Sequence, residues 1–244
     1  MKNQEKNWQE RTALMIGAGG LGRLKNSQVL VVGLGGVGAY AAEQLCRAGI
    51  GHLTIVDGDV VEKTNRNRQL PALVSNEGEP KAEILGKRFL DINPDLDLNI
   101  VGEYIGDDGI RVILENKKFD YIVDAIDTLT PKALLIKKSL EYGFPVVSSM
   151  GAGGKFNPSL IRVSDISKSY NCNLARALRK RLYSMGIRKG IKVVFSPEDV
   201  SPERIIPEEG RNKKSTVGTI SYMPAIFGCY CASVVIRDLL KSDG

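Results

Sequence analysis

A glycine-rich stretch that follows an apolar run constrains the fold of this chain most strongly. Residues 29–32 are all apolar and lead into Gly33, Gly35, Gly36 and Gly38, which carry the Gly-x-Gly-x-x-Gly spacing of the dinucleotide fingerprint. The first glycine permits a tight turn, the second lets a phosphate approach the backbone, and the last lets a helix pack closely on its strand. The motif predicts an adenine nucleotide, but it does not separate NAD from ATP.

Strand-like and helix-like segments alternate along the chain, beginning with a βαβ unit over residues 28–57. We therefore predict an α/β fold: a Rossmann-like, doubly wound and mostly parallel sheet with helices on both faces. The 244 residues suit one domain. We divide it into an N-terminal arm (1–27), a nucleotide-binding core (28–150) and a substrate-side portion (151–244) with a mobile loop at 197–214. Further strands are predicted at 96–101, 119–124, 145–149, 160–165 and 191–195, and further helices at 79–92, 108–115, 132–142, 173–185 and 223–240.

Polar residues follow the second strand at the edge where open α/β sheets bind ligands. Asp57 ends that strand, where a ribose hydroxyl would find its acceptor. Asn65, Arg68 and Gln69 can donate hydrogen bonds to phosphate oxygens. Lys81 lies at the start of a predicted helix, where a cation opposes the helix dipole unless an anion lies nearby. These residues predict a phosphate-rich ligand.

A second acidic site is predicted at the end of the strand at 119–124. A carboxylate there, on the same edge as the glycine turn, is a natural Mg²⁺ ligand. We favour Asp127 over Asp124, because Asp124 still belongs to the strand. A second glycine-rich turn follows the next strand, and a monovalent cation between Gly151 and Gly154 is left open.

The charge distribution predicts a polyanionic partner. The formal net charge is +6, which is modest, but basic residues gather in one short region. A cluster of Lys and Arg on one face favours nucleic acid. The residues of the predicted basic helix are Arg176, Arg179, Lys180 and Arg181.

The histidine and the cysteines exclude several kinds of site. His52 is the only histidine, and we expect it at a strand start near the surface, so a Ser-His-Asp triad elsewhere and a poly-histidine metal site are excluded. The four cysteines form no Cys-x-x-Cys pair, which argues against a zinc site built from four thiolates. We expect Cys229 and Cys231 to be buried as small apolar side chains.

Nothing in the sequence indicates a membrane protein. No apolar run approaches the roughly 20 residues of a membrane span, and the first eight residues are too polar for the core of a signal peptide. We expect a cytoplasmic protein.

Several motifs of the first half together resemble the ubiquitin-activating-enzyme-like adenylating family, also called ThiF-type. The resemblance implies that a carboxylate attacks the α-phosphate of ATP, giving an acyl-adenylate and pyrophosphate. It implies that the glycine loop holds the phosphates, Asp57 the ribose, and Asp127 a Mg²⁺ ion, and that Arg11 reaches the site of a neighbouring subunit. The motifs are Arg11, the glycines at 33–38, Asp57-Gly-Asp59, Asn65-x-x-Arg68-Gln69, Pro80-Lys81 and Asp124-x-x-Asp127; Asp59, Asn65, Arg68, Gln69 and Lys81 would complete the triphosphate site.

The second half is similar to the tRNA threonylcarbamoyladenosine dehydratases within that family. The segments that carry this likeness lie at 149–158, 161–168, 174–176, 179–182 and 193–196. The likeness implies activation of the threonyl carboxylate on a modified adenosine in tRNA, followed by ring closure that expels AMP. It also implies a homodimer, and it makes the basic helix a contact to tRNA phosphates. Cys172-Asn173 stands where Asp-Pro is usual.

Other functions stay open at this point. The main alternative is adenylation of the C-terminus of a small ubiquitin-like sulfur-carrier protein. Another is a nucleotide-binding regulator or an NAD enzyme that shares the glycine loop. A sulfur-relay protein is a further candidate partner.

Overall fold

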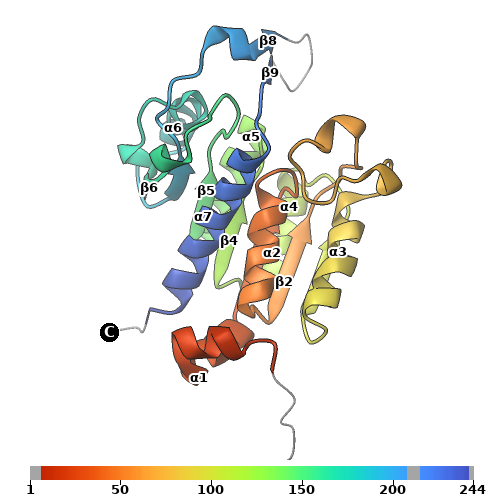
Figure 1. Cartoon of the computed structure of the whole chain (residues 1–244). Helices are drawn as coiled ribbons and strands as arrows, with labels where there is room; N and C mark the ends of the chain where they lie inside the picture. Colours follow the sequence, from red (N-terminus) through yellow and green to blue (C-terminus); the bar gives the residue numbers. More distant parts are fainter. Residues whose placement is uncertain (1–6, 208–214, 242–244) are drawn as a thin grey trace, which may run out of the picture.

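A central sheet of seven strands organises the molecule. The computed structural model describes residues 7–207 and 215–241 (Figure 1). The strand order is β3-β2-β1-β4-β5-β7-β6, and neighbours are parallel except for β6, which runs antiparallel to β7. The predicted doubly wound, mostly parallel α/β sheet is thereby confirmed. Its strands are β1 (Gln28–Val32), β2 (His52–Val56), β3 (Asp97–Val101), β4 (Tyr121–Asp124), β5 (Val146–Ser149), β6 (Arg162–Asp165) and β7 (Lys192–Phe195).

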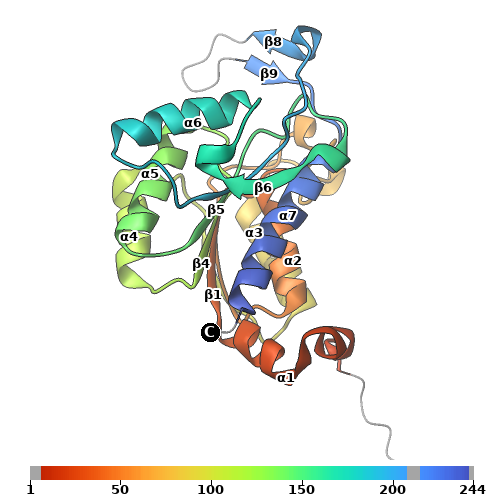
Figure 2. The ribbon, with the colours of Figure 1, turned by 90° about the vertical axis from the view of Figure 1, so that its left-hand side faces the viewer.

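Helices cover both faces of the sheet, as Figure 2 shows nearly edge-on. Successive residues of a strand point to opposite faces, so Val29 and Val31 pack into the core beneath α2, α3 and α7, whereas Leu30 and Val32 pack into the core beneath α4, α5 and α6. The helices are α2 (Gly38–Ala48), α3 (Lys81–Ile92), α4 (Asp107–Asn116), α5 (Leu129–Glu141), α6 (Asn173–Ser184) and α7 (Tyr222–Leu239).

The N-terminal arm forms helix α1 (Glu10–Asn26), which is kinked at Gly17. Gly17 has φ +71° and ψ 169°, a backbone conformation that suits glycine. Because α1 runs directly into the start of β1, it lies at the amino ends of the parallel strands, below α2 in Figure 1. The arm therefore lies at the end of the sheet opposite to the glycine loop.

The segment predicted as a mobile loop at 197–214 has regular structure over residues 202–207, which corrects the expectation of a plain loop there and leaves its mobility a prediction. Strand β8 (Ile205–Pro207) pairs antiparallel with β9 (Ser215–Val217), and a 3₁₀ turn over Pro202–Arg204 precedes it. Residues 208–214 lie outside the described part. Two three-residue strands are too short to leave a periodic pattern in the sequence, which is why the hairpin was not predicted.

His52 was expected near the surface, and the two cysteines of α7 were expected to be buried. His52 begins β2, is partly exposed, and its Nδ1 lies 2.9 Å from Asp97 Oδ2, as expected of a surface strand start. Cys231 is buried, and burial raises the pKa of its thiol to about 12. Cys229 is exposed, so its predicted burial is wrong. The inward face of α7 carries Phe227 and Cys231, four residues apart, and position 229 points away from it.

Within residues 7–207 and 215–241, no helix is long and apolar enough to cross a membrane.

Candidate nucleotide-binding and adenylation site

The glycine loop turns sharply between β1 and α2 because three of its positions leave no room for a side chain. Gly33 has φ +88°, and a Cβ there would lie 2.8 Å from the Ala125 carbonyl oxygen. A Cβ on Gly38 would lie 1.7 Å from the Gly33 carbonyl oxygen. A Cβ on Gly36 would lie 2.9 Å from Pro224 Cβ, at the start of α7. The loop is thus fixed between the turn after β4 and helix α7.

Gly35 differs, because its open side could receive a ligand. The nearest described atom to a Cβ at this position would be Gln69 Nε2, at 3.7 Å. The Gln69 Oε1 atom is buried and has no hydrogen-bond partner within the described part of the chain. A buried polar oxygen without a partner is costly. The space beside Gly35 and the unpartnered Gln69 Oε1 would fit a nucleotide, and the contact of Gln69 with it stays a prediction.

Asp57 follows β2 and ties that strand end to the glycine loop. Its Oδ2 accepts a hydrogen bond from the Leu34 N–H (2.5 Å), and its Oδ1 accepts one from the Asp59 N–H (2.7 Å). Burial raises the pKa of this carboxyl, while those two N–H donors and Lys81 oppose the rise. Each carboxylate oxygen can accept a second hydrogen bond, so Asp57 can still receive a ribose hydroxyl.

Lys81 is held at the same edge by an ion pair. It is the first residue of α3, only 4% exposed, and its Nζ lies 2.9 Å from Asp59 Oδ2. The Tyr104 hydroxyl donates to the other oxygen of Asp59, which raises the pKa of Tyr104 to about 12. Tyr104 was not predicted as part of this site. The loop after β3 lacks a motif, and only its place at the carboxyl end of a strand could have indicated it.

In the loop at residues 60–70, the side chains predicted to bind phosphate form hydrogen bonds within the loop itself. Asn65 is buried, and its Oδ1 accepts from the Glu62 N–H at 3.1 Å. Arg68 donates through Nη1 to the Thr64 carbonyl (3.0 Å) and to Asn67 Oδ1 (2.8 Å). These bonds give both side chains a structural role, and their contact with phosphate stays a prediction.

The two acidic residues after β4 have different surroundings. Asp124 ends β4 and is fully buried, with Lys132 Nζ at 2.7 Å and Ser148 Oγ at 2.6 Å from its Oδ2. Its Oδ1 accepts from the Ile126 N–H (3.1 Å), which shapes the turn beyond the strand. This confirms that Asp124 belongs to the strand. Asp127 is exposed in that turn, on the same edge as the glycine loop. Carboxylate oxygens suit Mg²⁺, so Asp127 stays the predicted ligand.

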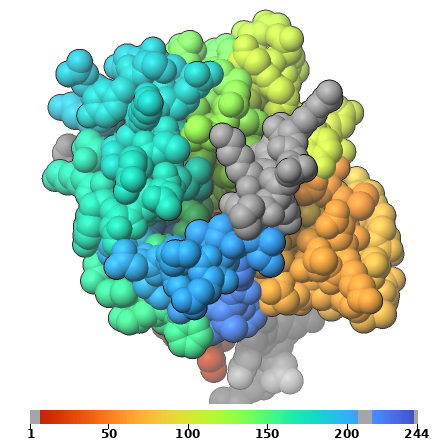
Figure 3. All heavy atoms as spheres, turned by 90° about the horizontal axis from the view of Figure 1, so that it is seen from above, coloured from red at the N-terminus to blue at the C-terminus, as the bar shows by residue number. Residues whose placement is uncertain are grey.

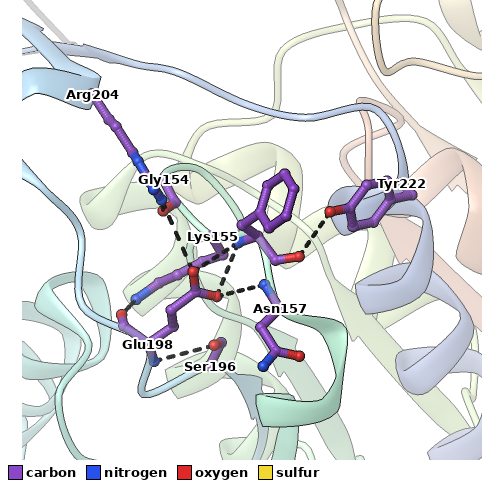
Figure 4. Close-up of polar contacts among 8 residues, drawn as sticks. Gly154, Lys155, Asn157, Ser196, Glu198, Arg204 and Tyr222 are labelled. Atoms are coloured by element: carbon purple, nitrogen blue, oxygen red, sulfur yellow. Dashed lines mark hydrogen bonds and ion pairs between the residues drawn. The ribbon is translucent and has the colours of Figure 1, made fainter.

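The second glycine-rich turn is fastened to the segment that follows β7 (Figure 4). The Glu198 carboxylate accepts from the N–H groups of Phe156 (2.9 and 3.0 Å) and Asn157 (2.8 Å). Arg204 Nη1 donates to the Gly154 carbonyl at 2.9 Å. Lys155 Nζ donates to the Glu198 carbonyl oxygen. These hydrogen bonds fix the conformation of the turn. Whether a cation binds between Gly151 and Gly154 stays open.

Segments of both halves meet at the carboxyl edge of the sheet. Figure 3 looks down on this edge, where the blue segment around β8 and β9 lies between the teal substrate-side portion and the orange segment that includes residues 60–70. Asn67 Nδ2 donates to the Thr219 carbonyl at 3.0 Å, which joins the two halves. The nucleotide-binding loops and the substrate side therefore share one surface.

The predicted basic residues of α6 divide into two groups. Arg176, Lys180 and Arg181 are exposed. Arg179 is half-buried, and its Nη1 donates to the Ser169 carbonyl at 2.7 Å. Three of the four side chains are thus available to a polyanion, and Arg179 fastens the helix to the preceding turn.

Arg11 is the one predicted site residue that lies far from the others. It is exposed on α1, at the amino ends of the strands, whereas the glycine loop follows the carboxyl end of β1. Within one chain the structure does not bring Arg11 to the glycine loop.

Metal binding by clustered side chains finds no support here. In the described ranges, no group of three or more His, Cys, Asp or Glu side chains could hold a metal ion.

The sheet, the glycine loop and the acidic residue after β2 define a nucleotide-binding α/β protein. More specifically, the chain belongs to the ThiF family, whose model matches residues 9–243. It is 38% identical over 239 residues to the tRNA threonylcarbamoyladenosine dehydratase of Bacillus subtilis (strain 168), covering 95% of this chain and 94% of that relative.

Solved structures give the same result. The tRNA N6-threonylcarbamoyladenosine dehydratase TcdA of E. coli in complex with ATP superposes with a TM-score of 0.87 and 34% identity, covering 97% of this chain and 96% of that chain. Its complex with AMP superposes with a TM-score of 0.86 over the same shares. The likeness covers both halves of the chain, so it includes the substrate side as well as the nucleotide-binding core.

Proposed function

We propose that this chain catalyses the ATP-dependent dehydration of N6-threonylcarbamoyladenosine in tRNA. The observation that carries the proposal is the likeness to dehydratases of this kind over nearly the whole chain. The threonyl carboxylate attacks the α-phosphorus of ATP and releases pyrophosphate. A nucleophile within the same side chain then attacks the activated carbonyl and releases AMP. In sum, the nucleoside loses one water and ATP becomes AMP and pyrophosphate.

The residues at the carboxyl edge fit the first step. Negative charge develops on the oxygens around phosphorus, and fixed cations aimed at them lower the barrier. Lys81, held by Asp59 at 2.9 Å, and Arg68 supply those cations in our proposal. The glycine loop and the N-terminus of α2 receive the phosphates, and Asp57 receives the ribose. Bound Mg²⁺ would neutralise phosphate charge, with Asp127 as its protein ligand.

The second step needs no protein nucleophile. The attacking group and the activated carbonyl belong to one side chain, so proximity supplies much of the rate. This agrees with the chemistry of the cysteines: burial raises the pKa of Cys46 to about 11 and that of Cys231 to about 12, which keeps both as unreactive thiols.

We propose three further features on the basis of family resemblance. The chain acts as a homodimer in which Arg11 reaches the partner's site, it works in the cytoplasm where it meets tRNA, and α6 contacts tRNA phosphates through Arg176, Lys180 and Arg181. A sulfur-relay protein is a further candidate partner.

The first experiment measures AMP release from ATP and Mg²⁺ with and without tRNA that carries the modification. We expect AMP only with that tRNA, together with a nucleoside lighter by one water. Arg68→Ala and Lys81→Ala should abolish turnover while the circular dichroism spectrum stays unchanged. Arg66→Ala is the matched control, since its Nε contacts the Lys63 carbonyl of the same loop, and it should stay active.

Other outcomes would redirect the proposal. AMP release that requires a small sulfur-carrier protein instead of tRNA would favour the alternative adenylation. Binding of NAD without binding of ATP would contradict both functions. Unfolding of both the Arg68 and the Lys81 variants would mean that these side chains are structural.

A further inference from the structure

An exposed phenylalanine stands on a rigid base beside the nucleotide-binding loops. All six phenylalanines lie in the described residues, and only Phe156, at 59%, is exposed. An isolated apolar side chain on a surface is ordinary. Phe156 is unusual because both its backbone N–H and its backbone carbonyl are hydrogen-bonded to side chains.

Glu198 and Tyr222 provide this fixation. The Phe156 N–H donates to both oxygens of the Glu198 carboxylate, at 3.0 and 2.9 Å. The Phe156 carbonyl accepts from the Tyr222 hydroxyl at 2.8 Å. The two rings meet edge to face, with centroids 6.0 Å apart and an interplanar angle of 68°. The ring is therefore held by its backbone and at one edge, while most of its surface faces solvent.

Through Tyr222, this ring lies on the same side of the molecule as the glycine loop. Phe156 follows the second glycine-rich turn, beyond the carboxyl end of β5. Tyr222 begins α7, and Pro224 two residues later packs against Gly36 of the glycine loop. Phe156 thus lies on the edge where the substrate must bring its carboxylate to the α-phosphate.

The charged neighbourhood suits RNA. Arg204 donates to the Gly154 carbonyl and lies 3.9 Å from Glu198 Oε1, yet 47% of its side chain is exposed. Exposed aromatic rings stack with unpaired bases, and cations on the same surface contact the phosphates, because every base has an aromatic face. Unpaired bases of RNA loops are recognised in this way.

We propose that Phe156 is a stacking platform for an unpaired base of the substrate tRNA, in the loop that carries the modified adenosine. This inference rests on the proposed function and adds a specificity-determining residue to it. The Glu198 carboxylate holds the backbone that presents the ring. The ring contributes to binding of RNA and takes no part in the chemistry.

The test is a series of substitutions at position 156, with the affinity for modified tRNA and the KM and kcat measured separately. Stacking on an aromatic side chain is worth roughly a ten-fold change in affinity. We expect Phe156→Ala and Phe156→Leu to raise the Kd and KM for tRNA by about that factor, with kcat and ATP affinity unchanged. Phe156→Trp and Phe156→Tyr should keep wild-type values, because both retain an aromatic face.

The matched control is Tyr142→Ala, an exposed aromatic at the end of α5, which should leave tRNA affinity unchanged. Equal affinities of Phe156→Leu and wild type for modified tRNA would overturn the proposal, because an apolar side chain without an aromatic face would then be enough for binding. A changed oligomeric state of Phe156→Ala would also overturn it, since the ring would then contact protein. The affinity for tRNA is measured without turnover. If wild type failed to release AMP, that result would count against the proposed function, and the affinity measurements would still test the stacking.

Discussion

Substitution of single glycines by alanine can distinguish glycines needed for folding from those needed for ATP binding in the glycine loop. A Cβ on Gly38 would lie 1.7 Å from the Gly33 carbonyl oxygen, whereas the nearest described atom to one on Gly35 would be Gln69 Nε2 at 3.7 Å. We expect Gly38→Ala to lower the melting temperature, because backbone must move. Gly35→Ala should melt like wild type, since its methyl group makes ordinary contacts, but should bind ATP at least ten-fold more weakly.

Calorimetric titration with ATP and thermal unfolding of both variants check this prediction. If Gly35→Ala bound ATP as wild type does, the open side of Gly35 would not be where phosphate lies.

The residues of this site were predictable to different degrees. The distinction between Asp124 and Asp127 follows from chain position, because a residue inside a buried strand pairs internally, and Asp124 does so with Lys132 at 2.7 Å. The contact between Tyr104 and Asp59 was not predictable, because it joins loops after two different strands. The half-buried state of Arg179 was also missed, since it depends on Ser169 in the preceding turn.

At the scale of elements, Asp238 fastens the end of α7 to the sheet. Its carboxylate accepts from the Tyr121 hydroxyl (2.8 Å) on β4, from Lys192 on β7 and from Lys241 (2.8 Å). Burial alone would raise the pKa of this carboxyl, but these hydrogen bonds outweigh it and lower the pKa to about 2. The last turn of α7 is thereby joined to two strands.

This lowered pKa predicts a pH-dependent contribution to stability. A carboxyl whose folded pKa lies below its unfolded value stabilises the protein above the unfolded value. The contribution of Asp238 is therefore fully present at pH 5 and is lost as pH falls from about 4 towards 2. Urea unfolding of wild type and Asp238→Asn should give a difference in unfolding free energy that is constant above pH 5 and shrinks below pH 4. A difference independent of pH would show that charge plays no part.

Long elements were predictable from local signals, and short ones were not. Helix α3 was expected at 79–92, from Pro80 in its first turn and Asn93-Pro94 after its end, and it is found at Lys81–Ile92, with Pro80 just before its first residue. The β8–β9 hairpin depends on the pairing of Ile205 with Val217 and of Ile206 with Thr216, which no local pattern encodes. The strand order β3-β2-β1-β4-β5-β7-β6 was not predicted, because no local pattern fixes which strands pair.

At the scale of the whole molecule, the position of α1 bears on how many chains form one site. Arg11 is exposed at the amino ends of the strands, and the glycine loop lies at the carboxyl end of β1. Gln9 is close to Gly49 beyond the end of α2, since a Cβ on Gly49 would lie 2.1 Å from Gln9 Nε2. A chain cannot place Arg11 in its own site without detaching α1, so a role for Arg11 requires a second copy.

Mixing two inactive variants tests this arrangement. Arg11→Ala and Lys81→Ala should each lack activity, one by removing the residue given to the partner and the other by disabling its own site. In a symmetric dimer with exchange of subunits, equal mixing makes about half of the dimers mixed, and each of these holds one intact site. Activity should therefore return to about a quarter of the wild-type value. If Arg11 acted within its own chain, each mixed dimer would have one site lacking Arg11 and one lacking Lys81, and mixing would restore nothing.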